Sequence, residues 1–172
     1  ADSLFRRLNS AKWPLSLKEL PLGSALVGGA VRDGLLNRLN NKPDLDVVVQ
    51  SNAINLAKEL SQRIGGTSVV LDPKRDIARL AINNWTIDFA KQFGNSLEED
   101  LLRRDFTINS IALTLSPKPK IVDPTGGLHD LRNHKLVAVS EQNLIDDPLR
   151  LLRLFRFSAQ LNFSIDEITN SF

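Results

Sequence analysis

Two adjacent glycines, Gly28 and Gly29, separate an apolar run from a helical pattern near the start of the chain. The run at Ser24–Val27 predicts a short buried strand, and the residues from about Ala30 to Arg38 predict a helix. Glycines at such a junction let backbone N–H groups approach an anion closely, and the helix N-terminus adds partial positive charge. The segment lacks the lysine of a Walker loop and the spacing of a dinucleotide fingerprint. It therefore predicts either a phosphate-binding bend or a tight turn that only needs a positive φ.

An Asp-x-Asp pair, Asp44 and Asp46, follows this bend at the start of a strand predicted at Leu45–Val49. Because alternate residues of a strand share a face, both carboxylates leave the same side. Such hard oxygen ligands suit Mg²⁺, and two ions can activate an attacking hydroxyl and stabilise a leaving pyrophosphate. Taken alone, the pair is more typical of a polar strand entry; its place after the glycine bend favours the metal site. Asp88, in the apolar strand predicted at Trp85–Phe89, is either a third carboxylate or a strand-end Asp that binds backbone amides.

The middle of the chain carries strand patterns, and the later part is mostly helical. The other predicted elements are strands at Thr67–Leu71 and Ile77–Ile82, a hairpin turn at Asn83-Asn84, a turn at Val122–Gly127, and helices at Ile54–Ile64, from the capping box of Ser96 and Glu99 into Arg103, and near Leu131. This order predicts an α+β fold, in which a mixed sheet with helices is followed by a helical part.

Three arginines, Arg150, Arg153 and Arg156, recur at a spacing of three late in the chain. They lie on a helix predicted from Pro148 to about Leu161, because proline suits the first helical position. The spacing gives that helix an electropositive face, although such a row is often simply solvated.

Ser164 and Glu167 form another capping box, with only five residues after it. A helix that begins there has little room, so we expect the chain to be the N-terminal part of a longer protein. We expect one domain at residues 1–140 and the start of an all-helical domain at residues 141–172.

The composition is typical of a soluble protein with a real core. Of 172 residues, 42% are hydrophobic and 24% are charged. No apolar run approaches the ~18 residues that a membrane span needs, and the N-terminus is too polar for a signal peptide. The lack of cysteine excludes disulfides and thiolate metal sites and fits a reducing cytoplasm, where we expect the protein. The net charge of +2 does not by itself indicate nucleic acid.

Four segments, in chain order, resemble the motifs of the class II tRNA nucleotidyltransferases, the CCA-adding enzymes and their poly(A) polymerase relatives. They are Gly28-Gly-Ala-Val-Arg-Asp33 with Asp44-Leu-Asp46 for motif A, Arg103-Arg-Asp-Phe-Thr-Ile-Asn109 for motif B, Asp123-Pro-Thr-Gly-Gly127 with Asp130-Leu131 for motif C, and Asp146-Asp-Pro-Leu-Arg150 with Arg153 and Arg156 for motif D. Asp146 departs from the family, which usually has Glu there. The resemblance implies a nucleotidyltransferase-type mixed sheet as a catalytic head, followed by a helical neck that is cut short here.

The resemblance also implies roles for residues of the first two motifs. Asp44 and Asp46 would bind Mg²⁺, and Asp88 would be a third catalytic carboxylate. The implied nucleotide-binding residues are Gly28, Gly29 and Arg32 at the phosphates, and Arg104, Asp105 and Asn109 at the ribose. Asp105 and Asn109 are four residues apart, so on a helix they share a face. Without the resemblance, Arg103 to Asp105 would be taken as a solvated turn with ion pairs.

In this family the residues that correspond to Asp147 and Arg150 hydrogen-bond the Watson–Crick edge of the incoming base. A carboxylate accepts from the exocyclic amine of CTP or ATP, whereas UTP and GTP present the wrong pattern. Arg153 and Arg156 continue the same helical face toward phosphate or base. Asp147 before Pro148 is also an ideal helix cap, which is the simpler interpretation of this segment alone.

The resemblance implies transfer of C or A residues from CTP or ATP to the 3′ end of tRNA, with release of pyrophosphate. Only nine residues, Phe89 to Leu97, separate Asp88 from Glu98. CCA-adding members have a longer segment there, so the short one favours a CC-adding enzyme. The alternatives are a poly(A) polymerase or A-adding relative, a nucleotide-binding module without activity, and an enzyme that modifies a small molecule. The sequence implies no membrane partner and leaves the oligomeric state open.

Overall fold

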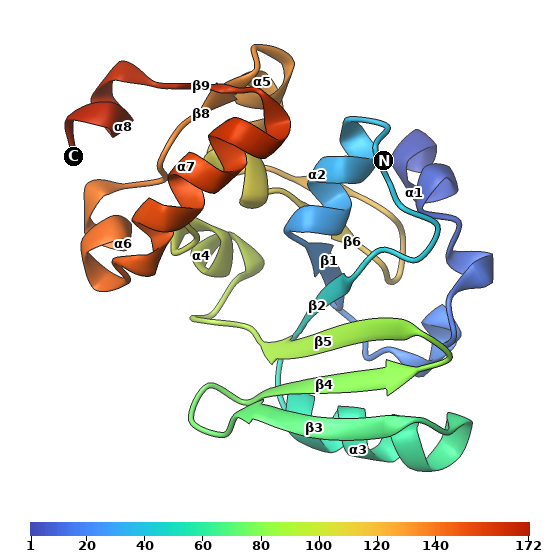
Figure 1. The fold of residues 1–172 in the computed structure, drawn as a ribbon. Coiled ribbons are helices and arrows are strands. Elements are labelled where there is room, and N and C mark those ends of the chain that lie inside the picture. Colours follow the sequence, from blue (N-terminus) through green and yellow to red (C-terminus); the bar gives the residue numbers. More distant parts are fainter.

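A computed structural model describes residues 1–172, and a seven-stranded mixed sheet is its centre (Figure 1). The strand order is β3-β4-β5-β2-β1-β6-β7. The strands are β1 (Ala25–Val27), β2 (Leu45–Val49), β3 (Thr67–Asp72), β4 (Ile77–Ile82), β5 (Trp85–Lys91), β6 (Ala112–Thr114) and β7 (Ile121–Val122). The helices are α1 (Asp2–Leu8), α2 (Gly29–Leu35), α3 (Ala53–Ile64), α4 (Leu97–Leu102), α5 (Gly127–Arg132), α6 (Glu141–Asp146), α7 (Leu149–Leu161) and α8 (Glu167–Ser171). Short 3-10 turns lie at η1 (Ser10–Lys12), η2 (Leu17–Glu19) and η3 (Thr107–Asn109).

The register of the sheet places the two candidate acidic strands side by side. β2 and β5 pair in parallel, with Asp46 opposite Asp88, while every other neighbour in this sheet is antiparallel. In β4 and β5 the side chains that alternate with the buried Leu80 and Ile87 include Arg79 and Asp88. Asp46, Asp88 and Arg79 therefore lie on one face of the sheet.

The two faces of the sheet are covered differently. α3 packs against β3, β4 and β5 on one face, and Ala53, Ala57 and Leu60 join the main core there (Figure 1). On the other face, Leu101 of α4 packs with Val27 and Val48 in a small separate core. The helix α4 covers β1 and β2 in this way and leaves part of β4 and β5 open.

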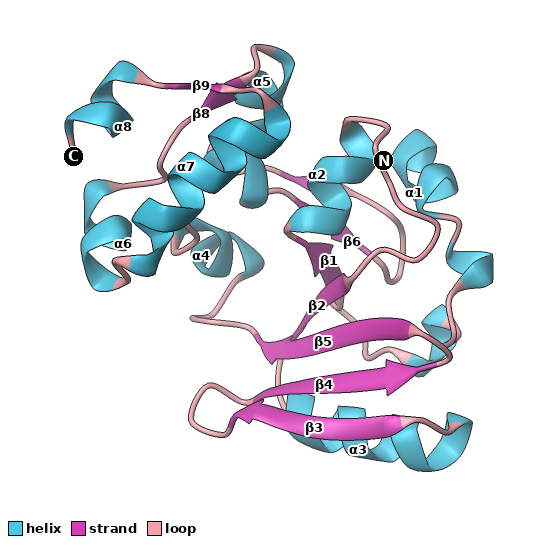
Figure 2. Cartoon of the chain, viewed as in Figure 1, coloured by secondary structure: helices cyan, strands magenta, loops and turns pink.

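The helices at the end of the chain pack on the same main core as the sheet. Leu154 and Phe157 of α7 are buried in it. A second, two-stranded sheet joins β8 (Lys135–Leu136) to β9 (Ser164–Ile165), so the segment predicted to be all-helical also contributes a strand (Figure 2). Residues on both sides of the predicted boundary at 140 thus share one core. No helix combines the length and the apolar character needed to cross a membrane.

Most predicted elements are confirmed to within a few residues. The hairpin at Asn83-Asn84 is confirmed, because φ is 50° and 61° at these residues, as a tight hairpin turn requires. The capping box at Ser164 is wrong: Ser164 is in β9, and Asp166 caps α8 by accepting from the backbone N–H of Ile168 and Thr169. At Ser96 the hydroxyl does cap Glu99, but the Glu99 carboxylate binds the N–H of Asn95.

Candidate active site

The glycine bend at Gly28 and Gly29 lies directly against the carboxylate of Asp46. Gly28 has φ 68° and ψ −137°, a conformation that L side chains rarely adopt. A Cβ built there would lie 3.1 Å from Asp46 Oδ2 and 3.9 Å from Arg104 Nη1. Glycine is therefore required at this position both by the backbone and by the closeness of the acid. Gly29 begins α2, and its missing Cβ faces Arg32 Nη2 at 3.8 Å.

Asp46 is largely buried and carries no hydrogen bond from a protein donor, while Asp44 is exposed. Burial, and next the negative charge of Asp88, raise the pKa of Asp46 to about 6, and Asp44 adds to this effect. Arg104 and Arg153 oppose it and lower that pKa. The site thus concentrates negative charge that the protein itself only partly neutralises.

Asp88 is paired with a cation of the neighbouring strand. Its two oxygens accept from Arg79 Nε at 2.7 Å and Arg79 Nη2 at 2.8 Å. This fork holds the pKa of the Arg79 guanidinium above its usual range. Asp88 therefore does not bind backbone amides, which was one of the two interpretations of its sequence position.

The donor set fits Mg²⁺ through Asp44 and Asp46. No group of three acidic or histidine side chains is arranged as a complete metal site. Mg²⁺ usually takes only one or two carboxylates from a protein and fills its other positions with water and substrate phosphates. The lone pairs of Asp46 are free of protein donors, and a cation there would relieve the repulsion from the negative charges of Asp88 and Asp44. These two residues meet that requirement.

Arg32 points into the protein, where it joins two segments of the site. Its guanidinium forms a fork on Asp33, with Nε to Oδ1 at 2.8 Å and Nη2 to Oδ2 at 3.0 Å. Nη1 donates to Asn109 Oδ1 at 2.8 Å. Arg32 is buried, so in this state it positions Asn109, 77 residues away in the chain.

Asp105 and Asn109 do meet, but not on an α-helix as the spacing suggested. The segment forms the 3-10 turn η3, and Asn109 Nδ2 donates to Asp105 Oδ1 at 3.2 Å. The same oxygen accepts from the N–H of Phe106 at 2.8 Å. The other oxygen, Oδ2, accepts from Arg153 of α7, so Asp105 joins the segment predicted to face the ribose to the arginine helix.

Phe157 of α7 lies among three arginines of the site. The guanidinium carbons of Arg32, Arg153 and Arg156 lie 5.0, 5.3 and 5.0 Å from its ring centroid. Phe106 meets the same ring edge-on at 6.0 Å. Arg32 and Arg153 are also paired with Asp33 and Asp105, so of the three only Arg156 has no carboxylate partner and keeps its charge uncompensated beside the ring.

Arg104 lies between the glycine bend and α4. Its Nη2 donates to Asp100 Oδ2 at 2.9 Å. Its Nε is buried and has no partner, although buried donors are normally satisfied. A different atom, Nη1, lies 3.9 Å from the Cβ position of Gly28 and donates to no protein group, so it is the donor of Arg104 that faces the glycine bend.

The predicted base-reading pair is held by the backbone. Arg150 Nη1 donates to the carbonyls of Arg103 at 3.0 Å and Asn143 at 2.9 Å, and its Nε lies 3.6 Å from Asp147 Oδ2. Asp147 Oδ1 accepts from the N–H of Leu149 at 3.2 Å, as the helix-cap interpretation required. Both residues border the site, and base reading by them stays a prediction.

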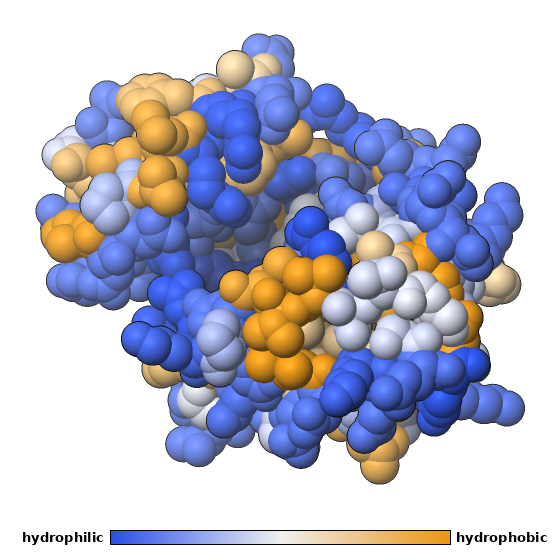
Figure 3. Space-filling model, turned by 60° about the horizontal axis from the view of Figure 1, so that its bottom comes forward, coloured by the Kyte–Doolittle hydropathy of each residue, from blue (hydrophilic) through white to orange (hydrophobic).

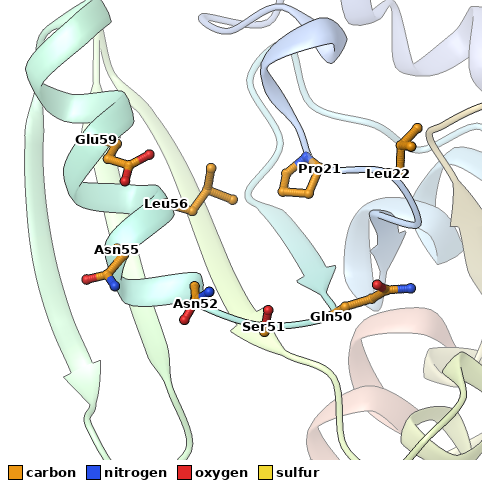
Figure 4. A pocket seen from close by; sticks show the side chains of 8 residues that line it. All are labelled: Pro21, Leu22, Gln50, Ser51, Asn52, Asn55, Leu56 and Glu59. Carbon is orange, nitrogen blue, oxygen red and sulfur yellow. The ribbon is translucent and has the colours of Figure 1, made fainter.

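Two hollows lie near the carboxyl ends of the parallel strands β2 and β5. A recess of about 700 Å³ lies on the open face, next to Arg104 and Arg150. Figure 3 shows a recess walled mainly by hydrophilic residues between the left part of the molecule, where α6 to α8 lie in Figure 1, and the rest. A smaller pocket of about 360 Å³ lies just past the carboxyl end of β2, between Leu22 and α3 (Figure 4). No cation lines that second pocket, so it does not suit phosphate.

Several residues of the site had no role assigned from the sequence. Asp100 was detectable, because it stands four residues before Arg104 at helical spacing. Asn143 and Phe157 gave no such signal, since their contacts with Leu102 and Phe106 depend on how distant segments fold together. Asp33 binds its neighbour Arg32, and that local pair was not assigned a role.

Known proteins match this chain closely. Residues 24–137 match the poly(A) polymerase head domain family. A CC-adding tRNA nucleotidyltransferase from Synechocystis is 48% identical over 158 residues, which are 92% of this chain and 38% of that protein. An A-adding tRNA nucleotidyltransferase from Aquifex aeolicus is 38% identical over 164 residues, 86% of this chain and 20% of that protein.

A solved structure of a tRNA nucleotidyltransferase with a primer tRNA and an incoming ATP analogue shares the fold with a TM-score of 0.75 at 38% identity. It covers 87% of this chain, which spans 45% of that one. The mixed sheet described above is thus the nucleotidyltransferase head of such proteins, and this chain spans less than half the length of each of these relatives. The chain belongs to the class II tRNA nucleotidyltransferases, the family of the CCA-adding enzymes and the poly(A) polymerases.

Proposed function

We propose that this protein adds C, A or both from CTP or ATP to the 3′ end of tRNA. The RNA 3′-hydroxyl attacks the α-phosphate, a new phosphodiester bond forms, and pyrophosphate leaves with the electrons of the broken P–O bond. The relatives named above are CC- and A-adding tRNA nucleotidyltransferases. One set of contacts supports this assignment most: a Cβ at Gly28 would lie 3.1 Å from Asp46 Oδ2 and 3.9 Å from Arg104 Nη1, and Asp105, the residue after Arg104, binds Arg153 of α7. In this proposal one nucleotide spans the acidic pair, the segment around Asp105 and the arginine helix.

The residues divide the work by their chemistry. Asp44 and Asp46 would hold Mg²⁺, and the ion would supply charge neutralisation at the phosphates and activation of the attacking hydroxyl. Asp88 adds negative charge beside Asp46 and fixes Arg79 near it. The backbone of Gly28 and Gly29 and the free donor of Arg104 face the phosphates. Catalysis then rests mainly on alignment and electrostatics, as in phosphoryl transfer generally.

Sugar and base are selected by different segments. Asp105 and Asn109, fixed by Arg153 and Arg32, face the ribose. Asp147 and Arg150 read the Watson–Crick edge of C or A, and Arg156 extends the electropositive face. In this proposal residues 1–140 are the catalytic head, and residues 141–172 begin the neck that carries the base-reading helix.

We favour addition of C over addition of a complete CCA end. Only Gln92 to Ser96 connect β5 to α4, and the N–H of Phe93 and Asn95 are already bound by Asp100 and Glu99. A five-residue connection held at two points leaves little chain for the rearrangement that would adapt one pocket from CTP to ATP.

Single-turnover addition tests both levels of the proposal. Protein from the complete gene is mixed with Mg²⁺ and a tRNA that lacks its last three nucleotides, with CTP, ATP, UTP and GTP supplied one at a time and then CTP with ATP. A CC-adding enzyme extends the RNA by two residues with CTP and adds nothing more when ATP is present. Completion of the terminal A contradicts the CC-adding assignment, and no incorporation with any nucleotide contradicts the function itself.

A further inference from the structure

The recess on the open face adjoins the candidate carboxylates. Ile77 and Ala90 line it, and they pair across β4 and β5 next to the pair of Arg79 and Asp88. Ala90 follows Asp88 by two residues on the same face of β5, which is about 7 Å along the strand. A chain whose end is held at Asp88 can therefore continue directly into the recess.

The walls of the recess are strongly basic. They carry one carboxylate, Asp100, and six cationic residues: Lys74, Arg75, Lys91, Arg103, Arg104 and Arg150. Both oxygens of Asp100 are engaged, one by the N–H of Phe93 at 2.9 Å and the other by Arg104. The excess of positive charge is therefore free to attract a polyanion from solution.

Four of these cations have no strong partner in the protein. Lys74, Lys91 and Arg103 form no salt bridge. Arg75 has only a loose contact of 3.7 Å with Asp72, and its side chain is 79% exposed. They come from the β3–β4 turn, the end of β5 and the end of α4, so three segments bring like charges together without an internal counter-charge. These exposed side chains together give the recess a positive potential that attracts an anion from solution.

An aromatic ring stands in the same wall. Phe93 is half exposed, and the guanidinium of Arg103 lies 3.7 Å from its ring centroid. A basic groove with an exposed aromatic ring suits single-stranded nucleic acid, in which phosphates meet the cations and a base meets the ring. A free phosphate would make no use of Phe93.

The occupant is longer than one nucleotide. Of the six cations, only Arg104 and Arg150 belong to the nucleotide site proposed above; the other four lie beyond it. We propose that the recess binds the phosphodiester backbone of the RNA primer just upstream of its 3′ end. The inference rests on the proposed function, because it assumes that the 3′ end lies at Asp46 and Asp88.

Equilibrium binding of RNA separates this inference from catalysis. The probe is a labelled acceptor-stem hairpin with a single-stranded 3′ end, and its Kd is measured by fluorescence anisotropy over a range of KCl without nucleotide. Protein from the complete gene is compared with the double variant Lys74→Glu, Lys91→Glu. Lys58→Glu is the matched control, since Lys58 is exposed on α3 at the opposite face of the sheet. CTP affinity is measured in parallel by calorimetry.

We expect the double variant to bind the hairpin at least tenfold more weakly at low salt and to keep its CTP affinity within twofold. The slope of log Kd against log[KCl] should fall by about 0.7 for each RNA phosphate that the variant no longer neutralises. Lys58→Glu should match the wild type. Unchanged hairpin binding in the double variant overturns the inference, whatever the change in its CTP affinity. If the double variant weakens hairpin binding as expected but the wild type adds no nucleotide, RNA binding by the recess is supported and the proposed function is contradicted.

Discussion

Arg153 on α7 binds one oxygen of Asp105 through two nitrogens, with Nε at 2.8 Å and Nη2 at 2.7 Å from Oδ2. The Asp105 side chain is only 5% exposed, so this is the buried end of an ion pair whose arginine is about half exposed. Its other oxygen is bound to Asn109 and Phe106. The late helix is thereby fixed to the segment proposed to face the ribose.

Replacing Arg153 by alanine should destabilise the protein even without substrate. The change leaves Asp105 buried and charged with one oxygen unpaired, which we expect to lower the free energy of unfolding by about 2 kcal/mol. Urea denaturation measures this. Arg156→Ala is the matched control, because Arg156 also lies near Phe157 but has no carboxylate partner, and it should change stability by less than about 0.5 kcal/mol. Equal losses in both variants would contradict the ion pair as the cause.

Asp46→Asn should stabilise the protein at neutral pH while abolishing activity. The pKa of Asp46 is raised from 3.8 to about 6, so the folded state binds its proton more tightly than the unfolded state does. Stability from this group is therefore present below about pH 4 and is lost as pH rises through 6. The difference at pH 7.5 is on the order of 3 kcal/mol and vanishes near pH 4.

Denaturation of both proteins at pH 4 and pH 7.5, in EDTA, measures this difference. Addition of Mg²⁺ at pH 7.5 should stabilise the wild type and leave Asp46→Asn unaffected, since the bound cation removes the repulsion among the carboxylates. A gain that is the same at both pH values would show that the charge of Asp46 is not its source.

Local elements were predictable from the sequence because their causes are local. The strand Leu45–Val49 was predicted with its observed bounds, since β-branched and apolar residues fill it. The hairpin at Asn83-Asn84 needed only two residues that tolerate positive φ. The helix cap predicted at Ser164 was wrong because an N-cap pattern competes with strand pairing. Here β8 supplies a partner strand for Ser164.

The hydrogen bonds that connect the segments of the site were not predictable, because they join residues that are far apart in the chain. Arg32 was expected at the phosphates, yet it binds Asp33 and Asn109 inside the protein. Nothing local to Arg32 distinguishes these outcomes. Likewise the cations of the basic recess come from four separate segments, and neither the net charge of +2 nor any single run of residues indicates it.

Gly28→Ala should reduce activity far more than it reduces stability. A Cβ at Gly28 meets both an unfavourable φ and the oxygen of Asp46 at 3.1 Å, so the acid must move. Gly126→Ala is the matched control: Gly126 has φ 77° but nothing within 4 Å of the added Cβ. Gly126→Ala, with Gly126 in the left-handed region, should lose about 1 kcal/mol of stability, and Gly28→Ala, with ψ −137° outside that region, about 2 kcal/mol. Only Gly28→Ala should lower kcat/KM for CTP by tenfold or more, and similar kinetics in the two variants would exclude a role for this close approach.

Arg150→Ala should loosen the choice of base. Its guanidinium is aimed by two carbonyls, those of Arg103 and Asn143, and lies next to Asp147, so its remaining donors have a fixed direction. A rigid donor beside a carboxylate discriminates between the amine of CTP and the carbonyl of UTP, because the wrong base leaves buried polar groups unpaired. Loss of the arginine should reduce the ratio of kcat/KM for CTP to that for UTP about tenfold or more. Arg150→Lys keeps the charge but not the fork, so it should also lose discrimination. Competition between labelled CTP and UTP on one RNA primer measures the ratio directly, and a ratio equal to that of the wild type in both variants would remove Arg150 from base reading.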